Sequence, residues 1–239
     1  MGIDRIVLDE VDSTSAEAMR RMPDKPTWIL ARQQTAAKGR RGRVWYMSPG
    51  NFAASLIFRS GDAPARLALR SFSAALALHD ALSGFGVSGL ALKWPNDVLL
   101  DGGKLAGILL ESPTPGILVV GIGINLIAAP DRAEVERGAV RPVSLLEIAG
   151  LRITPEQMLD ALVPAFAARE AQPFQRIRAD WLVRAARMHQ PIGVRTMTET
   201  VEGTFDGLDP DGRLVLGTPD GPRLIAAGDV VFDGAATCS

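Results

Sequence analysis

The chain has 239 residues, of which 47% are hydrophobic and 22% charged, a composition typical of a folded globular protein and not of a disordered one. Its 26 basic and 27 acidic residues give a net charge of −1, which argues against a basic surface for non-specific nucleic-acid binding. The one cysteine, Cys238, excludes an intrachain disulfide framework and a cysteine-based zinc site, and the two histidines leave little room for a histidine-rich metal centre. No signal peptide is visible, and the longest nearly apolar stretch, residues 116–130, is shorter than the about 20 residues of a membrane span. We therefore expect a cytoplasmic protein without a membrane or DNA partner.

The first third of the chain is predicted to alternate strands and helices. A strand over residues 3–8 leads into a helix in which Thr14 and Glu17 have the spacing of a capping box, and this helix must end before Pro23. Hydrophobic patterning then predicts strands over residues 27–32 and 52–58 and an apolar helix over residues 67–82.

The centre of the chain is predicted to form a meander of strands. One strand over residues 90–94 is interrupted by residues 95–97 and resumes over residues 98–100. An Asp-Gly-Gly turn follows, so residues 104–110 should fold back antiparallel. The apolar run over residues 117–125 suits a buried strand.

A helical pattern covers residues 143–188. Thr154 is a good N-cap before Pro155, because proline fits the first position of a helix. Pro164 and Pro173 are expected to divide the pattern into shorter helices.

The C-terminal segment changes from helical to β character. Short β-type runs alternate with the turns DPDG and TPDG, as in a small barrel or sandwich. The runs cover residues 201–205, 214–216, 223–226 and 230–232. We therefore expect a domain of residues 1–188 followed by a small β domain of residues 189–239.

The first candidate site is the segment Lys38–Arg43, KGRRGR, which places four cations in six positions. Its glycines permit main-chain N–H groups to approach an anion closely, and arginine forks suit phosphate. Trp45 lies close enough in sequence to stack on a base. A solvated basic loop and a nucleic-acid patch are the two alternative readings.

The second candidate is KWPND, residues 93–97, together with Lys104. Lys93 stands between apolar residues, so its ammonium must reach a pocket or an anionic partner. A hairpin would bring both lysines, Asn96 and Asp97 to one end of a sheet. The alternative is a plain turn at Asn96 and Asp97 with Lys104 in solvent.

The third candidate is GIGIN, residues 121–125. It closes a strand and lacks a third glycine that opens a helix, so it is no dinucleotide-binding fingerprint. Glycines in a buried strand indicate close approach by either a ligand or a neighbouring strand. Asn125 needs a hydrogen-bond partner if it is buried.

In their order along the chain, these segments resemble the biotin protein ligases. The pair KWPND and KLAGIL is highly specific to that family. The motifs are DSTS (12–15), QT (34–35) leading through KGRRGR to Trp45, SPGN (48–51), KWPND (93–97), KLAGILLE (104–111) and GIGIN (121–125).

The resemblance implies an α/β (α+β) fold. Its mixed, mainly antiparallel sheet with flanking helices is related to class II aminoacyl-tRNA synthetase domains, and a small SH3-like β-barrel forms the C-terminal domain. Because the first motif begins within the first dozen residues, we expect a ligase without an N-terminal DNA-binding domain, as a monomer or weak homodimer.

The implied reaction has two steps. The carboxylate of biotin attacks the α-phosphate of ATP to give biotinyl-5′-AMP and pyrophosphate, with Mg²⁺ offsetting charge on the leaving group. A lysine on the biotin carboxyl carrier protein or domain of acetyl-CoA carboxylase, or a related carboxylase, then attacks the anhydride and releases AMP. Lipoate or octanoate transfer on the same fold is the nearest alternative, and nucleic-acid binding through KGRRGR is a more distant one.

The resemblance also implies roles for individual residues, without assigning direct metal ligands. Lys104 is expected to bridge the biotin carboxylate and the α-phosphate as the main catalytic residue, with Arg40 and Arg43 beside it. The expected biotin-binding residues are Ser13, Thr14, Ser15, Gln34, Lys38, Gly39, Arg40, Lys104 and Gly107. The expected ATP-binding residues are Arg41, Arg43, Trp45, Lys93, Asn96, Asp97 and Asn125.

Two residues depart from the family's usual pattern. Ser15 stands where asparagine is usual, and Lys38 stands where arginine is usual, which keeps the charge but loses the planar fork. Few apolar residues anchor the segment Lys38–Arg43, so we expect it to be mobile without ligands.

Overall fold

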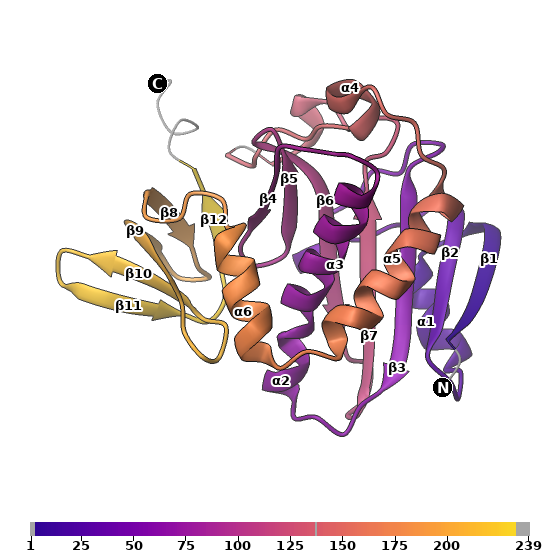
Figure 1. Ribbon diagram of the computed structural model, residues 1–239, viewed down its shortest axis with the longest axis horizontal. Coiled ribbons are helices and arrows are strands. Elements are labelled where there is room, and N and C mark those ends of the chain that lie inside the picture. Colours follow the sequence, from indigo (N-terminus) through magenta and orange to yellow (C-terminus); the bar gives the residue numbers. More distant parts are fainter. Residues whose placement is uncertain (1–2, 137, 233–239) are drawn as a thin grey trace.

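The computed structural model describes residues 3–136 and 138–232, so Cys238 lies outside the described residues. The larger of its two sheets has the strand order β1-β2-β3-β7-β6-β5-β4 (Figure 1). Only β1 and β2 pair in parallel among the paired strands of this sheet, which confirms the predicted mixed, mainly antiparallel sheet. The strands are β1 (Asp4–Val11), β2 (Thr27–Gln34), β3 (Phe52–Arg59), β4 (Leu90–Lys93), β5 (Asp97–Leu100), β6 (Gly103–Glu111) and β7 (Ile117–Ile124).

Helices cover both faces of this sheet because its strands alternate two sets of apolar side chains. Leu30, Leu56 and Val120 join the main core with the long helices α3 and α5, whereas Ile29 and Ile57 pack on Ala18 of α1. No described helix combines the length and apolar character needed to cross a membrane. The helices are α1 (Thr14–Arg21), α2 (Pro64–Ala68), α3 (Arg70–Gly84), α4 (Leu145–Ala149), α5 (Pro155–Glu170) and α6 (Phe174–Val183).

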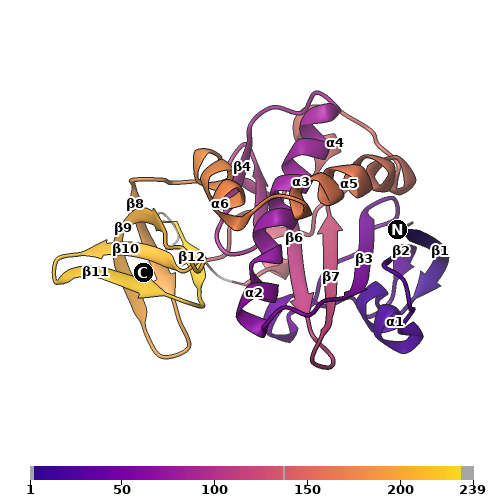
Figure 2. The same ribbon diagram turned by 60° about the horizontal axis from the view of Figure 1, so that its bottom comes forward.

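The second sheet is antiparallel and lies beside α6 (Figure 2). Both predicted turns are found, with Asp209–Gly212 joining β9 to β10 and Thr218–Gly221 joining β10 to β11. Strand β8 was not predicted from the sequence, because Pro191 and Gly193 are unusual in a short strand. The strands are β8 (Pro191–Arg195), β9 (Thr200–Leu208), β10 (Leu214–Thr218), β11 (Gly221–Ile225) and β12 (Asp229–Val231).

The predicted capping box of α1 is wrong. The N-cap is Ser13, whose Oγ accepts a hydrogen bond from Ala16 N at 3.4 Å. Glu17 is in the first turn but pairs with Arg20 and Arg21, at 2.7 and 2.6 Å, because two arginines one turn away are better partners than a backbone N–H.

The interruption predicted at residues 95–97 is found, but the strand does not resume in the same direction after it. Residues 94–96 reverse the chain through a cis Trp94–Pro95 peptide, so β4 and β5 form a hairpin in which Lys93 pairs with Asp97. The predicted division of the helical region is right at Pro173, the N-cap of α6, but wrong at Pro164, which lies inside α5. Proline removes one backbone hydrogen bond there, while the buried side of the helix, with Leu162 and Phe166, continues past it.

Candidate active site

A cavity of about 620 Å³ lies on the α1 side of the large sheet, over β6 and β7. Residues of segments 37–46, 130–136 and 138–142 and of strand β12 also line it. All but one of the predicted site residues line this cavity: Ser13, Thr14, Ser15, Gln34, Lys38, Gly39, Arg40, Arg43, Trp45, Lys93, Asn96, Asp97, Lys104, Gly107 and Asn125. The exception is Arg41, whose left-handed backbone (φ 57°) breaks the turn there and whose Nη1 lies 3.4 Å from Asp229 Oδ2.

Three glycines form the floor of the cavity. A Cβ at Gly123 would lie 2.5 Å from the Trp45 indole, and one at Gly107 would lie 3.2 Å from the same ring. A Cβ at Gly121 would lie 2.8 Å from Ser15 Oγ. The glycines of GIGIN therefore allow close approach by neighbouring side chains of this chain. These side chains are Ser15 of α1 and Trp45 of the loop after KGRRGR, and a Cβ on the strand would displace them.

A β-bulge places Lys104 on this floor. The pairing of β5 with β6 shifts by one residue between Val98 and Leu99, which changes the alternation of side chains along β6. Lys104 and Gly107 therefore share the cavity side, and a Cβ on Gly107 would lie 3.6 Å from Lys104 Nζ. In a regular strand, two residues three positions apart, such as Lys104 and Gly107, lie on opposite faces. The bulge places them on the same face.

Two lysines share one buried carboxylate. Lys104 Nζ lies 2.7 Å from Asp97 Oδ1, and Lys93 Nζ lies 3.5 Å from Asp97 Oδ2. Burial lowers the pKa of Lys93. Burial tends to raise the pKa of Asp97, but the charges of Lys104 and Lys93 outweigh it and leave that pKa below its ordinary value. The predicted gathering of two amines, Asn96 and a carboxylate at one end of the sheet is thus confirmed.

The arginines of KGRRGR turn towards the C-terminal sheet. Asp229 at the start of β12 accepts from Arg40 Nη1 at 3.0 Å and from Arg43 Nη2 at 2.6 Å. Burial lowers the pKa of Arg40, and for Asp229 the three arginines outweigh burial and lower its pKa. These ion pairs hold Arg40, Arg41 and Arg43 against the folded protein, which disfavours the reading of a freely solvated loop.

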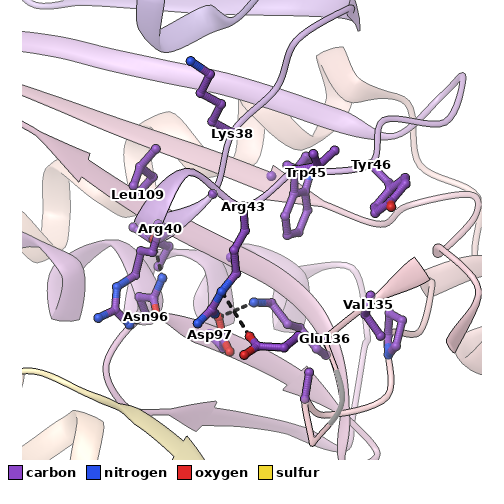
Figure 3. Close-up of a pocket in the computed structure, with 18 of the residues that line it drawn as sticks. Lys38, Arg40, Arg43, Trp45, Tyr46, Asn96, Asp97, Leu109, Val135 and Glu136 are labelled. Carbon is purple, nitrogen blue, oxygen red and sulfur yellow. Dashed lines mark hydrogen bonds and ion pairs between the residues drawn. The ribbon is translucent and has the colours of Figure 1, made fainter. Parts of the chain in front are cut away.

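Glu136 makes a second link across the cavity (Figure 3). Its Oε2 lies 3.2 Å from Arg43 Nε, and its Oε1 accepts from Arg195 Nη1 at 2.9 Å. Lys38 points away from Arg40 and Arg43 in this view. Asp229 and Glu136 were not predicted from the sequence, since neither stands in a motif and only the tertiary fold brings them to the loop.

Asn125 and the 12–15 segment complete the walls. Asn125 is buried and its Nδ2 donates to Val143 O at 3.1 Å, which supplies the partner that its burial requires. At the other end, Thr14 N donates to Gln34 Oε1 at 2.7 Å. The cavity thus has a hydroxyl and amide end and a strongly cationic end.

The donor set offers no closed metal cage. Among the described residues, no three Asp, Glu, His or Cys side chains gather closely enough to hold an ion. The cavity carboxylates that pair with cations, Asp97, Glu136 and Asp229, are each already neutralised by lysine or arginine. A divalent cation here would take ligands from outside this set of side chains, such as a bound anion or water.

Comparisons with known proteins agree with this architecture. Residues 8–126 match the model of the biotin/lipoate A/B protein ligase family, and residues 190–233 match that of the biotin protein ligase C terminal domain. A solved biotin protein ligase from Aquifex aeolicus, in complex with biotin and ATP, has the same fold, with a TM-score of 0.85, 24% identity, and coverage of 95% of this chain and 97% of that one.

Two curated relatives match nearly the whole chain. A biotin–[acetyl-CoA-carboxylase] ligase from Paracoccus denitrificans is 49% identical over 240 residues, which cover 95% of this chain and 100% of the relative. A protein of the same name from Mycobacterium tuberculosis is 29% identical, with 94% of this chain and 87% of the relative covered. On this identity and coverage, the chain belongs to the biotin protein ligase family.

Proposed function

We propose that this chain activates biotin with ATP and transfers it to a lysine of a biotin carboxyl carrier domain of acetyl-CoA carboxylase or a related carboxylase. The observation that carries the proposal is the pairing of a hydroxyl and amide end with a cationic end in one cavity. Biotin has the same polarity, with a polar ring at one end and a carboxylate at the other. Because the reaction consumes ATP and modifies a metabolic enzyme, we place it in the cytoplasm.

The first step has to overcome charge repulsion. An attacking carboxylate and a triphosphate are both anionic, so the site must hold fixed positive charge where they meet. We assign this task to Lys104, with Arg40 and Arg43 binding phosphate oxygens. A carboxylate oxygen of biotin forms a bond to the α-phosphorus, the bond to the bridging oxygen breaks, and pyrophosphate leaves.

Asp97 prepares Lys104 for this task. Before substrates bind, Asp97 Oδ1 holds the Lys104 ammonium at 2.7 Å over the glycine floor, which fixes its direction. Arg40 and Arg43 are likewise held by Asp229. We propose that substrate oxygens replace these carboxylates as partners, so that cationic groups need little reorganisation when charge develops.

Mg²⁺ enters this scheme with the nucleotide. Because Mg²⁺ favours phosphate oxygens and waters over an all-protein cage, the absence of a three-carboxylate group among the described residues fits a metal carried by ATP. It would supply charge neutralisation on the departing pyrophosphate.

In the second step the acceptor lysine of the carrier attacks the carbonyl carbon of biotinyl-5′-AMP. The C–N bond forms, the bond to the phosphate oxygen breaks, the lysine loses a proton, and AMP leaves. Trp45 and Asn125 are proposed to hold the adenosine part of this intermediate, because both line the cavity.

Pyrophosphate release tests the first step. The purified protein is incubated with ATP and Mg²⁺ together with biotin, lipoate or octanoate, one acid at a time. We expect release that depends on biotin. Release with lipoate or octanoate but not biotin would overturn the proposed substrate in favour of the alternative acids.

A further inference from the structure

Ser55 is a fully buried polar residue in an apolar part of the sheet. It lies on β3 between Ile29 of β2 and Gly121 of β7 in register, and its exposed fraction is 0%. Thr14 and Ser15 line the cavity, whereas Ser55 does not. Its Oγ lies 2.8 Å from Thr14 Oγ1 and 3.0 Å from Ser15 Oγ, so it joins two cavity residues from below.

The direction of each hydrogen bond in this cluster follows from one backbone donor. Thr14 N can only donate, so the atom that it meets at 2.7 Å must be the Gln34 carbonyl oxygen. That oxygen can only accept, so the Thr14 hydroxyl, 3.1 Å away, donates to it. The hydroxyl has a single proton, and it is now committed to Gln34.

The same rule then fixes the two serines. Because the Thr14 proton is committed, Ser55 must donate in the 2.8 Å contact with Thr14 Oγ1. Because the Ser55 proton is committed in turn, Ser15 must donate in the 3.0 Å contact with Ser55 Oγ. Ser15 therefore offers only lone pairs to the cavity, and Gln34 offers the two N–H groups of its amide.

Gly121 makes this chain of hydrogen bonds possible. A Cβ at this position would lie 2.8 Å from Ser15 Oγ and 3.5 Å from Ser55 Oγ, in the space that the two hydroxyls use. The hydrogen bond between Ser15 of α1 and Ser55 of β3 therefore depends on the glycine at position 121 of β7.

We propose that Ser55 is a positioning residue that fixes the polarity of the ring-binding end of the cavity, so that Ser15 accepts from a ring N–H and Gln34 donates to a ring carbonyl. A cyclic urea, which has a carbonyl between two N–H groups, matches this polarity. A dithiolane or an alkyl chain, which has neither group, does not. This inference rests on the proposed function and adds to it a residue that selects for the urea without touching it.

The test is Ser55→Ala in the full chain. The variant leaves Thr14 Oγ1 without its donor and frees the Ser15 proton to point into the cavity against a ring N–H. We expect the biotin KM for pyrophosphate release to rise about fivefold or more, the loss typical of one or two neutral hydrogen bonds. The ATP KM and the kcat at saturating biotin should stay within about twofold, because Ser55 does not contact the reacting groups.

Controls separate this role from a general effect on the fold. Ser73→Ala removes a buried hydroxyl from α3 outside the cavity and should leave the biotin KM unchanged. Ser55→Cys, a weak donor, should fall between wild type and alanine. Inhibition by octanoate, which lacks a urea, should be the same in wild type and Ser55→Ala.

The outcomes are distinct. A wild-type protein that releases no pyrophosphate with biotin overturns the proposed function itself. An active wild type with an unchanged biotin KM in both Ser55 variants overturns the role of Ser55 alone. Parallel losses for biotin, ATP and octanoate also overturn it, because they indicate a distorted cavity and no selection for the urea. If Ser55→Ala does not fold, as judged by thermal unfolding, Ser55→Cys decides by the same biotin KM.

Discussion

Asp97→Asn removes the charge of the carboxylate that contacts the amines of both Lys93 and Lys104. Asp97 and Lys93 are each 7% exposed, whereas the Lys104 side chain is 31% exposed and can turn towards solvent. The amide keeps the shape of the carboxylate, so the main consequence is a buried Lys93 ammonium that has lost the carboxylate in contact with it. Removing one partner of a buried pair costs about 3–5 kcal/mol of unfolding free energy. Because Lys104 can relax, we expect about 3 kcal/mol at neutral pH, the lower end of that range.

The loss of unfolding free energy in Asp97→Asn is expected to depend on pH. Burial already lowers the pKa of Lys93, and losing Asp97 lowers it further. The unfolded lysine titrates near about 10.4, so between the two values the unfolded chain binds more protons and the stability of the variant rises with pH. The loss relative to wild type should therefore shrink on going from neutral to alkaline pH.

The stability of the wild-type protein should also depend on pH in the acid range, through the Asp97 carboxylate. The folded pKa of Asp97 lies below its ordinary value, so its contribution is complete above the unfolded pKa of about 3.9 and is lost as pH falls through the folded pKa. This acid component should be absent in Asp97→Asn.

Urea unfolding at neutral pH and at about pH 9 measures the loss of stability and its decrease at alkaline pH. Asp9→Asn is the matched control, because Asp9 pairs with Arg32 at the surface and its removal should cost about 1 kcal/mol or less. A loss for Asp97→Asn that equals the control, or one that does not shrink with pH, would refute the reasoning.

Three further predictions concern the cavity. Lys104→Ala should abolish biotin-dependent ATP–pyrophosphate exchange while thermal unfolding stays cooperative, and near-normal exchange would rule out its proposed role. Asp229→Ala frees the loop arginines from their carboxylate, so trypsin should cut segment 38–43 faster in the ligand-free protein, and biotin plus ATP should restore protection; an unchanged cleavage rate would show that Asp229 does not hold the loop. Gly123→Ala places a methyl 2.5 Å from the Trp45 indole and must displace it, so the ATP KM should rise about tenfold, and an unaltered ATP KM would remove Trp45 from the nucleotide site.

The strands and the main site motifs could be predicted because their signals are local. Apolar runs predicted β3 and β7, and the spacing of KWPND and KLAGIL indicated that Lys93 and Lys104 lie close together. The errors arose where packing between distant parts of the chain determines the direction of a strand or the end of a helix. The pattern showed a break at residues 95–97 but not that the chain reverses there, and Pro164 did not end α5, whose buried side continues past it.

The partners of the loop were out of reach for a different reason. Asp229 begins a strand of three residues and Glu136 lies in a connecting segment, so neither carries a pattern of its own. Ser55 stands in a predicted strand, but its link to Ser15 depends on the absence of a side chain at Gly121. The expected division into residues 1–188 and 189–239 stays a prediction, since Trp181 of α6 contacts both Phe72 of α3 and Phe205 of β9.

Transfer of labelled biotin to a carrier domain tests the central claim most directly. The protein is incubated with ATP, Mg²⁺, labelled biotin and a biotin carboxyl carrier domain, beside the same domain with its acceptor lysine changed to arginine. We predict stable label on the wild-type domain alone, with AMP formed in equal amount. Label that appears on both domains, or that needs no ATP, would contradict the account.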